Sequence, residues 1–189
     1  EGITEFLPIS STGHLILVNQ WLSFSPSFTI MFDVVVQLGA ILAVVVVFWK
    51  KLWPFGKSEA EKKITLNVLN LNIWYKTILA VVPALVLGAL FGNIIEERLF
   101  NPYVVAVALI IGGVVLILLE KRNPVAPTTL FTSAISYRTA FYIGLFQCLA
   151  MIPGTSRAAA TIIGAMLLGA SRTAAVEFSF FLAIPTMVA

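Results

Sequence analysis

The sequence predicts an all-α integral membrane protein, a multi-span helical bundle with two re-entrant helix–loop–helix hairpins. Of its 189 residues, 59% are apolar and only 11% are charged, with a mean hydropathy of +0.99. Soluble domains are far richer in charge. Apolar runs of roughly 20 residues recur, which is the length that crosses a bilayer core. Two short polar strings interrupt them, and we treat residues 1–189 as a single transmembrane domain.

The first polar string predicts a re-entrant hairpin over residues 1–22. A short helix at 2–7 is broken by Pro8, and a polar turn leads to a second short helix at 15–22. This pattern is tolerated in membranes only where the free backbone groups face protein or water. The chain begins without Met inside the string and stops within an apolar run, so we expect it to be truncated at both ends.

Three predicted spans follow, at about 30–49, 78–95 and 103–119. The positive-inside rule makes the connection between the first two cytoplasmic, and the acidic connection at 93–102 external. The cytoplasmic connection carries Lys50, Lys51, Lys57, Lys62, Lys63 and Lys76. Because the basic residues lie beside spans and not along one polar face, the net charge of +3 reflects topology. Membrane lipids are the expected surroundings, and no nucleic acid partner is expected.

The second polar string predicts a re-entrant hairpin over residues 139–170. A helix at 139–152 ends at Pro153-Gly154, a helix at 158–168 restarts after Arg157, and a last span begins near Ala174. Aligning Pro8 with Pro153 sets Ser11 opposite Ser156, which indicates an inverted repeat or a chance match in an apolar sequence. Inverted repeats bring interrupted helices to a shared site near the midplane. We therefore predict that the two strings form one active site.

Two carboxylates begin the first string. Glu1 and Glu5 are four residues apart and would share one face of a helix. Carboxylate oxygens suit a hard divalent cation, Mg²⁺ or Ca²⁺. A solvated helix end is the alternative, mainly for Glu1.

Hydroxyl groups and the single histidine end the first string. Ser10, Ser11 and Thr12 precede Gly13-His14. A serine becomes a good nucleophile when a base takes its proton, and histidine titrates near neutral pH. These hydroxyls are equally suited to capping the next helix, and both uses are compatible.

The second string has the form of an anion site. Thr155, Ser156 and Arg157 open a helix whose first N–H groups and dipole attract phosphate. The guanidinium can bind two phosphate oxygens and neutralise charge as a P–O bond breaks. Thr161, four residues on, would share that helix face. The alternative is that Arg157 extends to a lipid headgroup.

The two strings resemble the signature motifs of the undecaprenyl-diphosphatase family of the bacitracin-resistance type. Glu1-Gly-Ile-Thr-Glu-Phe-Leu-Pro-Ile-Ser-Ser-Thr-Gly-His14 and Pro153-Gly-Thr-Ser-Arg157 carry the resemblance, with further matches at 32–46, 146–150 and 177–180. It runs through all 189 residues. It implies a multi-pass enzyme of the bacterial plasma (inner) membrane that removes the terminal phosphate of a polyprenyl diphosphate lipid, with a divalent cation, at a site open to the outer (periplasmic) side.

The resemblance also assigns residues. It places the acidic pair at Glu1 and Glu5, which we predict as metal ligands. It makes Glu5, Ser11, His14 and Arg157 the predicted catalytic residues, and Ser156, Arg157 and Thr161 predicted phosphate-binding residues. From the hydroxyl pattern of the strings themselves, we also predict phosphate binding by Ser10, Thr12 and Thr155. This chain departs from the pattern at Ala158-Ala159, where the family has Ser-Gly.

A different class of function stays open at this point. Paired re-entrant loops are also transporter architecture. The alternative is a translocase (flippase) or transporter that binds the same phosphorylated lipid, or phosphate, without hydrolysis. The nucleophile, the cation, the lipid length and a homodimeric state are left open by the residues alone.

Overall fold

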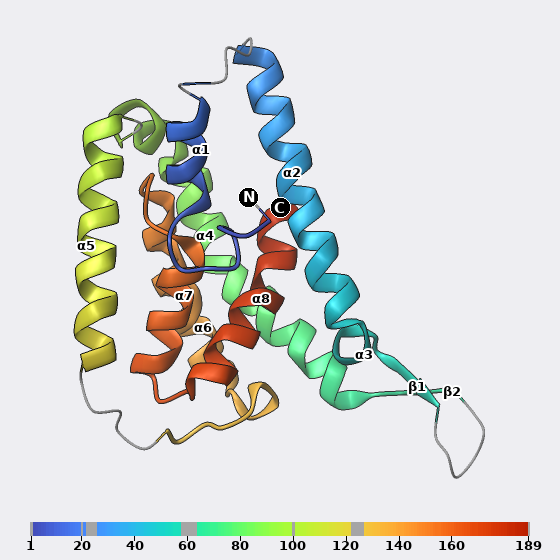
Figure 1. The fold of residues 1–189 in the computed structure, drawn as a ribbon. Coiled ribbons are helices and arrows are strands. Elements are labelled where there is room, and N and C mark those ends of the chain that lie inside the picture. Colours follow the sequence, from blue (N-terminus) through green and yellow to red (C-terminus); the bar gives the residue numbers. More distant parts are fainter. Residues whose placement is uncertain are drawn as a thin grey trace.

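The computed structural model describes residues 2–19, 21, 26–57, 64–99, 101–121 and 127–188. These residues form a helical bundle with one small two-stranded hairpin at its edge (Figure 1). The elements are α1 (Ser11–Asn19), α2 (Pro26–Val47), α3 (Trp49–Leu52), β1 (Phe55–Lys57), β2 (Ile64–Leu66), α4 (Val68–Leu99), α5 (Pro102–Lys121), η1 (Thr132–Ala134), α6 (Tyr137–Gln147), η2 (Cys148–Met151), α7 (Arg157–Leu167) and α8 (Arg172–Val188). The predicted helical class is confirmed.

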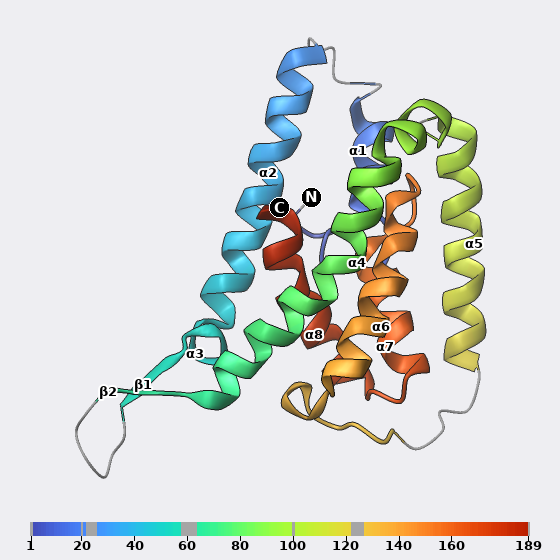
Figure 2. The same ribbon diagram turned by 180° about the vertical axis from the view of Figure 1, so that it is seen from behind.

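Small residues let the central helices α4, α6, α7 and α8 pack closely (Figure 2). Alanines dominate their buried cluster, together with Ile143, Phe178 and Leu182. At the tightest crossing, a Cβ added to Gly144 of α6 would lie 2.1 Å from the Ala80 carbonyl oxygen of α4. Close backbone approach of this kind is typical of helix packing in membranes.

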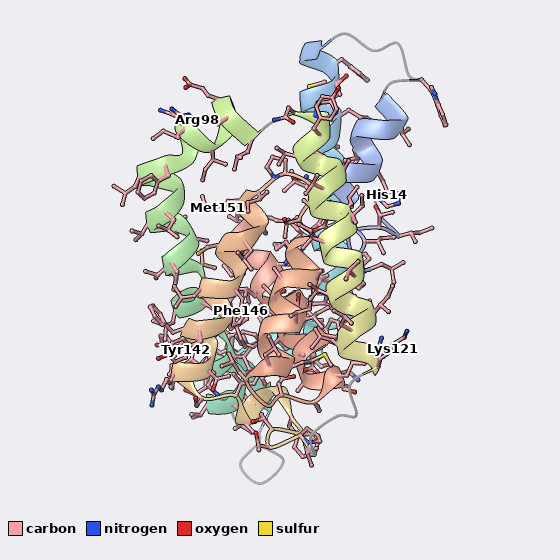
Figure 3. The ribbon with its side chains drawn as sticks, turned by 90° about the vertical axis from the view of Figure 1, so that its left-hand side faces the viewer. His14, Arg98, Lys121, Tyr142, Phe146 and Met151 are labelled. Carbon is pink, nitrogen blue, oxygen red and sulfur yellow. The ribbon has the colours of Figure 1, made fainter. Side chains whose placement is uncertain are left out.

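The helices α4 and α5 also present apolar side chains to the outside of the bundle. In the part of the chain that the structure describes, two helices are long and apolar enough to cross a membrane, Val68–Ile95 and Pro102–Leu119. Only 17% and 6% of their most apolar windows are buried. The charged residues Arg98 and Lys121 lie at opposite ends of the bundle (Figure 3). The apolar surface between those ends is therefore available to lipid.

The first polar string differs from the predicted hairpin. Residues 2–9 form turns and not the predicted helix at 2–7. A helical segment this short has an unfavourable nucleation step, and Pro8 disfavours helical geometry at the residue before it. The helix α1 begins at Ser11, before the predicted start at residue 15, and the last residue of the predicted hairpin, Leu22, lies outside the described residues.

Ser10 explains where α1 begins. Its φ of +62° breaks the chain direction, and its Oγ accepts a hydrogen bond from the Gly13 N–H at 3.3 Å. This satisfies one of the free N–H groups of the first turn. The predicted capping role of the serine cluster is thus confirmed for Ser10.

The described parts of the lysine-rich connection, at 49–57 and 64–67, contain regular secondary structure. They contain α3 and the antiparallel strands β1 and β2, paired with Phe55 opposite Leu66. Trp49 and Trp53 stack with ring centroids 4.6 Å apart. Side-chain contacts between aromatic residues stabilise this turn, which composition alone did not indicate.

The second polar string reverses the chain between α6 and α7, as predicted at Pro153-Gly154. The helix α6 before it ends at Gln147, earlier than the end predicted at residue 152, and the 3₁₀ helix η2 follows it directly. Gly154 has a φ of +89°, and an added Cβ would lie 2.7 Å from the Val105 carbonyl oxygen of α5. Only glycine fits this conformation at so close an approach.

Candidate active site

Glu5 and Arg157 bring the two polar strings together. Arg157 Nη2 lies 2.8 Å from Glu5 Oε1, although the residues are 152 positions apart in the chain. The two side chains are 14% and 9% exposed. A buried ion pair is costly to desolvate, and removing either partner leaves an uncompensated charge. The pair therefore ties the fold of the first string to that of the second.

Ser11 completes a three-residue cluster with this pair. Its Oγ donates a hydrogen bond to Glu5 Oε2, so the hydroxyl and the guanidinium bind different oxygens of one carboxylate. A carboxylate that already accepts the hydroxyl hydrogen is placed to take that proton. The predicted catalytic residues Glu5, Ser11 and Arg157 are thus neighbours in space.

A polar cavity of about 110 Å³ lies beside the cluster. Glu5, Ser10, Ser11, Gln37, Ala150, Thr155, Ser156, Arg157, Ala158 and Met187 line it. Among these residues Glu5 carries the single carboxylate and Arg157 the single cation. Gln37, from α2, was not assigned to the site from the sequence, because one amide within an apolar helix gives no signal of where it points.

The N-terminus of α7 faces this cavity. Ser156 caps the helix, since its Oγ accepts from the Ala159 N–H at 3.2 Å, and Thr155 and Arg157 flank it. The helix dipole adds partial positive charge there. Together with the Arg157 guanidinium, it makes this wall suited to phosphate.

Thr161 lies elsewhere than predicted. It is fully buried, and its Oγ1 contacts the carbonyl oxygen of Arg157 at 2.9 Å, that of Ala158 at 3.2 Å and the Ser179 Oγ at 2.6 Å. It is not among the residues that line the polar cavity. The predicted direct contact of Thr161 with phosphate is therefore not supported by its position.

His14 lies on α1 with its ring exposed (Figure 3). Its Nδ1 is 2.8 Å from the Ser10 carbonyl oxygen. Since a carbonyl only accepts, Nδ1 carries the hydrogen and Nε2 is the basic nitrogen. Ser10, which binds this ring through its backbone, also lines the cavity.

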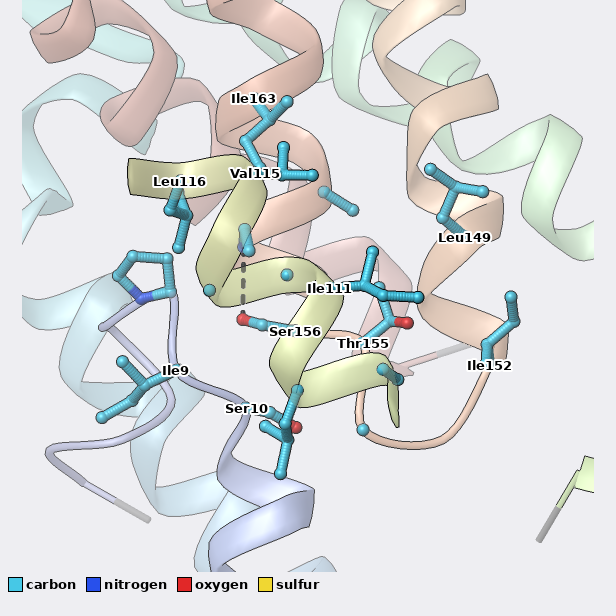
Figure 4. Close-up of a pocket in the computed structure, with 18 of the residues that line it drawn as sticks. Ile9, Ser10, Ile111, Val115, Leu116, Leu149, Ile152, Thr155, Ser156 and Ile163 are labelled. Carbon is cyan, nitrogen blue, oxygen red and sulfur yellow. Dashed lines mark hydrogen bonds between the residues drawn. The ribbon is translucent and has the colours of Figure 1, made fainter. Parts of the chain in front are cut away.

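A large apolar groove of about 780 Å³ adjoins the polar cavity (Figure 4). Its walls come from α5, α6, η2, α7 and the first string, and include Ile9, Ile111, Val115, Leu116, Leu149, Ile152 and Ile163. Ser10, Thr155 and Ser156 line both spaces. The groove thus ends at the polar site. Nothing in the sequence of α5, an ordinary apolar span, signals it.

The predicted metal ligands are only partly described. Glu1 lies outside the described residues, as does the side chain of Thr12, which we predicted to bind phosphate. Within the described ranges, no group of three or more His, Cys, Asp or Glu side chains gathers in one place. Glu5 keeps free lone pairs beside its two present partners, since each carboxylate oxygen can accept more than once. A cation at Glu1 and Glu5 stays a prediction.

Comparison with known proteins connects this site to a family. Residues 1–189 match the model of the family described as bacitracin resistance protein BacA. The chain is 56% identical over 192 residues to an undecaprenyl-diphosphatase of Lachnoclostridium phytofermentans. This alignment covers 99% of this chain and 68% of the relative. An undecaprenyl-diphosphatase of Enterococcus faecalis is 52% identical over 192 residues, which cover 100% of this chain and 69% of the relative. Undecaprenyl-diphosphatase 1 of Clostridioides difficile is 53% identical over 190 residues, which cover 100% of this chain and 68% of the relative. The family resemblance read from the two polar strings is confirmed, and the chain belongs to the bacitracin resistance protein BacA family.

Proposed function

We propose that this chain is a phosphatase that hydrolyses undecaprenyl diphosphate to undecaprenyl phosphate and inorganic phosphate. The observation that carries the proposal is the cluster of Glu5, Ser11 and Arg157 on a polar cavity that shares a wall with a large apolar groove. The relatives at 52–56% identity bear the name of this activity. Their names favour hydrolysis over the translocase alternative.

The two adjoining spaces suit the two parts of this substrate. The apolar groove takes the first isoprene units, because burial of apolar surface is favourable by about 25 cal/mol per Å². The diphosphate then lies at the shared wall of Ser10, Thr155 and Ser156. The terminal phosphoryl group extends into the polar cavity towards Arg157.

The hydrogen bond from Ser11 to Glu5 supports a serine nucleophile. Glu5 takes the proton as Ser11 Oγ bonds to the terminal phosphorus, the P–O bond to the bridging oxygen breaks, and undecaprenyl phosphate leaves. Arg157 and the α7 N-terminus stabilise the charge that develops. Water then attacks the phosphoserine and releases phosphate. Proton removal by the His14 Nε2, or direct attack by water or by His14, is the alternative route.

Glu1 and Glu5 are the residues that we propose for a divalent cation, Mg²⁺ or Ca²⁺. Carboxylate oxygens and substrate phosphate oxygens are the donor set that Mg²⁺ commonly takes. When bound, the cation would neutralise phosphate charge.

The short helices support re-entrant hairpins in a membrane. The helices α6 and α7 have 11 residues each and α1 has 9. At 1.5 Å per residue they are about 16 and 14 Å long, against a bilayer core of about 30 Å. They are too short to cross. We propose that both hairpins enter the bacterial plasma membrane and return within it.

The capping serines support an inverted repeat. Ser10 accepts from the N–H three residues on at the start of α1, and Ser156 does the same at the start of α7. Both serines line the polar cavity. This pairing shifts the repeat by one residue from the alignment that set Ser11 opposite Ser156.

With the lysine-rich connection cytoplasmic, we propose that the site opens to the outer side.

Phosphate release from undecaprenyl diphosphate by the full parent protein in detergent tests the proposed function. The assay is run with Mg²⁺ or with EDTA, beside Arg157→Ala and the exposed control Arg138→Ala. We expect release by the parent protein and by Arg138→Ala, and loss with EDTA or with Arg157→Ala. Lipid binding without release by the parent protein would contradict hydrolysis, and release in EDTA would contradict only the cation.

A further inference from the structure

We infer that Ser179 of α8 is a positioning residue for Arg157. This inference rests on the proposed function, because it concerns the cation of the same site. Nothing in the polar strings points to Ser179. It is fully buried and lines neither the polar cavity nor the apolar groove, so it acts only through its neighbours.

Ser179 contacts Arg157 directly at one place and, through Thr161, indirectly at a second. Its carbonyl oxygen accepts a hydrogen bond from Arg157 Nη1 at 3.4 Å. Its hydroxyl lies 2.6 Å from Thr161 Oγ1, and Thr161 in turn contacts the carbonyl oxygen of Arg157 at 2.9 Å. One residue of α8 therefore reaches both the guanidinium and the peptide group of the same arginine.

The directions of these hydrogen bonds follow from counting hydrogens. Thr161 has one hydroxyl hydrogen, and the carbonyl oxygens of Arg157 and Ala158 can only accept it. We therefore assign Ser179 as the donor of the bond between the two hydroxyls, because in this arrangement both hydroxyl hydrogens are used. The Ser179 hydroxyl hydrogen completes a series of hydrogen bonds that runs from α8 through Thr161 to the first turn of α7.

Burial strengthens the effect of this series of hydrogen bonds on the geometry of Arg157. Thr161 and Ser179 are both 0% exposed, so water does not compete for their hydrogen bonds. An unsatisfied buried group is expensive, and buried networks favour one geometry. With Nη1 held by α8, Nη2 is directed at Glu5 before substrate arrives. A preorganised cation costs no rearrangement as negative charge develops.

The competing explanation is packing alone, since a small residue allows α7 and α8 to approach. Ser179→Ala separates the two explanations, because it keeps the volume small and the carbonyl oxygen in place but removes the donated hydrogen. A purely packing role predicts little change in turnover. Loss of positioning predicts that kcat falls about tenfold while KM changes less than threefold.

The experiment is a double-mutant cycle in the full parent protein with Ser179→Ala, Arg157→Lys and both together, because Arg157→Lys is expected to keep the measurable turnover that Arg157→Ala loses. Phosphate release and the affinity for undecaprenyl diphosphate are measured for each. The control is Thr186→Val, which removes another α8 hydroxyl that bonds Leu182 and Gln147 and not Arg157. We expect Ser179→Ala to reduce kcat only when Arg157 is present, and Thr186→Val to leave kcat near normal.

Two results would overturn the inference: normal kcat in Ser179→Ala, or an equal loss with and without Arg157. If Ser179→Ala fails to fold in detergent, Thr161→Val and Thr161→Ser replace it. Only Thr161→Ser keeps the hydroxyl and should retain turnover, and equal turnover of the two would count against the inference.

Failure of the proposed function looks different, because the unmodified protein would then release no phosphate. In that case the affinity cycle decides, and an effect of Ser179→Ala that is independent of Arg157 overturns the inference.

Discussion

At the scale of single residues, the site depends on one carboxylate with two partners. Glu5 accepts from Ser11 with one oxygen and pairs with Arg157 through the other. Neither partner could be deduced from spacing, since Arg157 is far away in the chain and Ser11 is six residues on. The carboxylate thus links the proposed nucleophile, Ser11, to the proposed phosphate-binding cation, Arg157.

We expect Glu5→Gln to reduce kcat by roughly 10²–10⁴-fold, the usual contribution of a general base. The amide cannot take the Ser11 proton, and it leaves the Arg157 charge without its partner. Breaking a buried pair costs about 3–5 kcal/mol, so thermal unfolding in detergent should also shift downward. Glu177→Gln is the control, because Glu177 is 15% exposed but its partner Lys51 is 58% exposed, so loss of this half-solvated pair should cost less than loss of the Glu5–Arg157 pair. Normal turnover in Glu5→Gln would rule out Glu5 as the base.

Arg157→Lys tests whether the fork of the guanidinium matters beyond its charge. Separate nitrogens reach Glu5 and Ser179 in the native site. One ammonium cannot reproduce both contacts and a phosphate contact. We expect kcat to fall about 10²–10³-fold, as when a transition-state donor is lost. Turnover of Arg157→Lys close to that of the unmodified protein would show that a point charge suffices.

At the scale of helices, close packing of α6 on α4 supports the second hairpin. The backbone of Gly144 lies against Ala80 where a side chain would clash with a carbonyl. Backbone atoms cannot move aside as a flexible side chain can. The two helices would have to separate to admit even a methyl group.

We therefore expect Gly144→Ala to destabilise the protein by about 1–3 kcal/mol, the usual cost of overpacking. Gly92→Ala on α4 is the control, because an added Cβ there meets nothing within 4 Å. Thermal unfolding of both variants in the same detergent measures the difference. Equal midpoints would mean that the crossing is looser than the structure indicates.

At the scale of the whole molecule, the apolar groove would select long lipids if the isoprene chain lies in it as we propose. It lies between α5 and the second hairpin and ends at Ser10, Thr155 and Ser156 (Figure 4). Selectivity for chain length then depends on how much of the groove is free. It is separate from the chemistry at Glu5.

Gly113→Phe should raise KM for undecaprenyl diphosphate about tenfold or more, because the ring occupies part of the groove. Farnesyl diphosphate, whose isoprene units would lie in the same groove, should be affected as well, whereas inhibition by inorganic diphosphate, which has no chain, should change little; kcat should change little for either lipid. Val114→Phe, at the next position of α5 and outside the groove lining, is the matched control. An unchanged KM for both lipids, or equally weakened inhibition by inorganic diphosphate, would contradict the placement of the chain in this groove.

Much of the architecture could be predicted from the sequence. Apolar run length indicates helices because a bilayer core has a fixed thickness. Pro153-Gly154 marks the reversal because proline and glycine restrict or permit particular backbone angles. The helix expected at 2–7 was wrong because six residues before a proline gain little from local hydrogen bonds. The helix and strands at 49–57 and 64–66 were missed because contacts between residues, such as the stacking of Trp49 on Trp53, support them, and composition does not report such contacts.

The sequence by itself determined the helical class, the position of the second break, the family, and the residue types of the site. Composition and local backbone preference act over short stretches, and motifs preserve chemistry in order. Only the tertiary structure decided which groups meet. It paired Glu5 with Arg157, moved Thr161 from the cavity wall into the core, and brought Gln37 and Ser179 from other helices to the site or beside it. These outcomes depend on the rotation and crossing of whole helices, which are set by packing between segments distant in the chain.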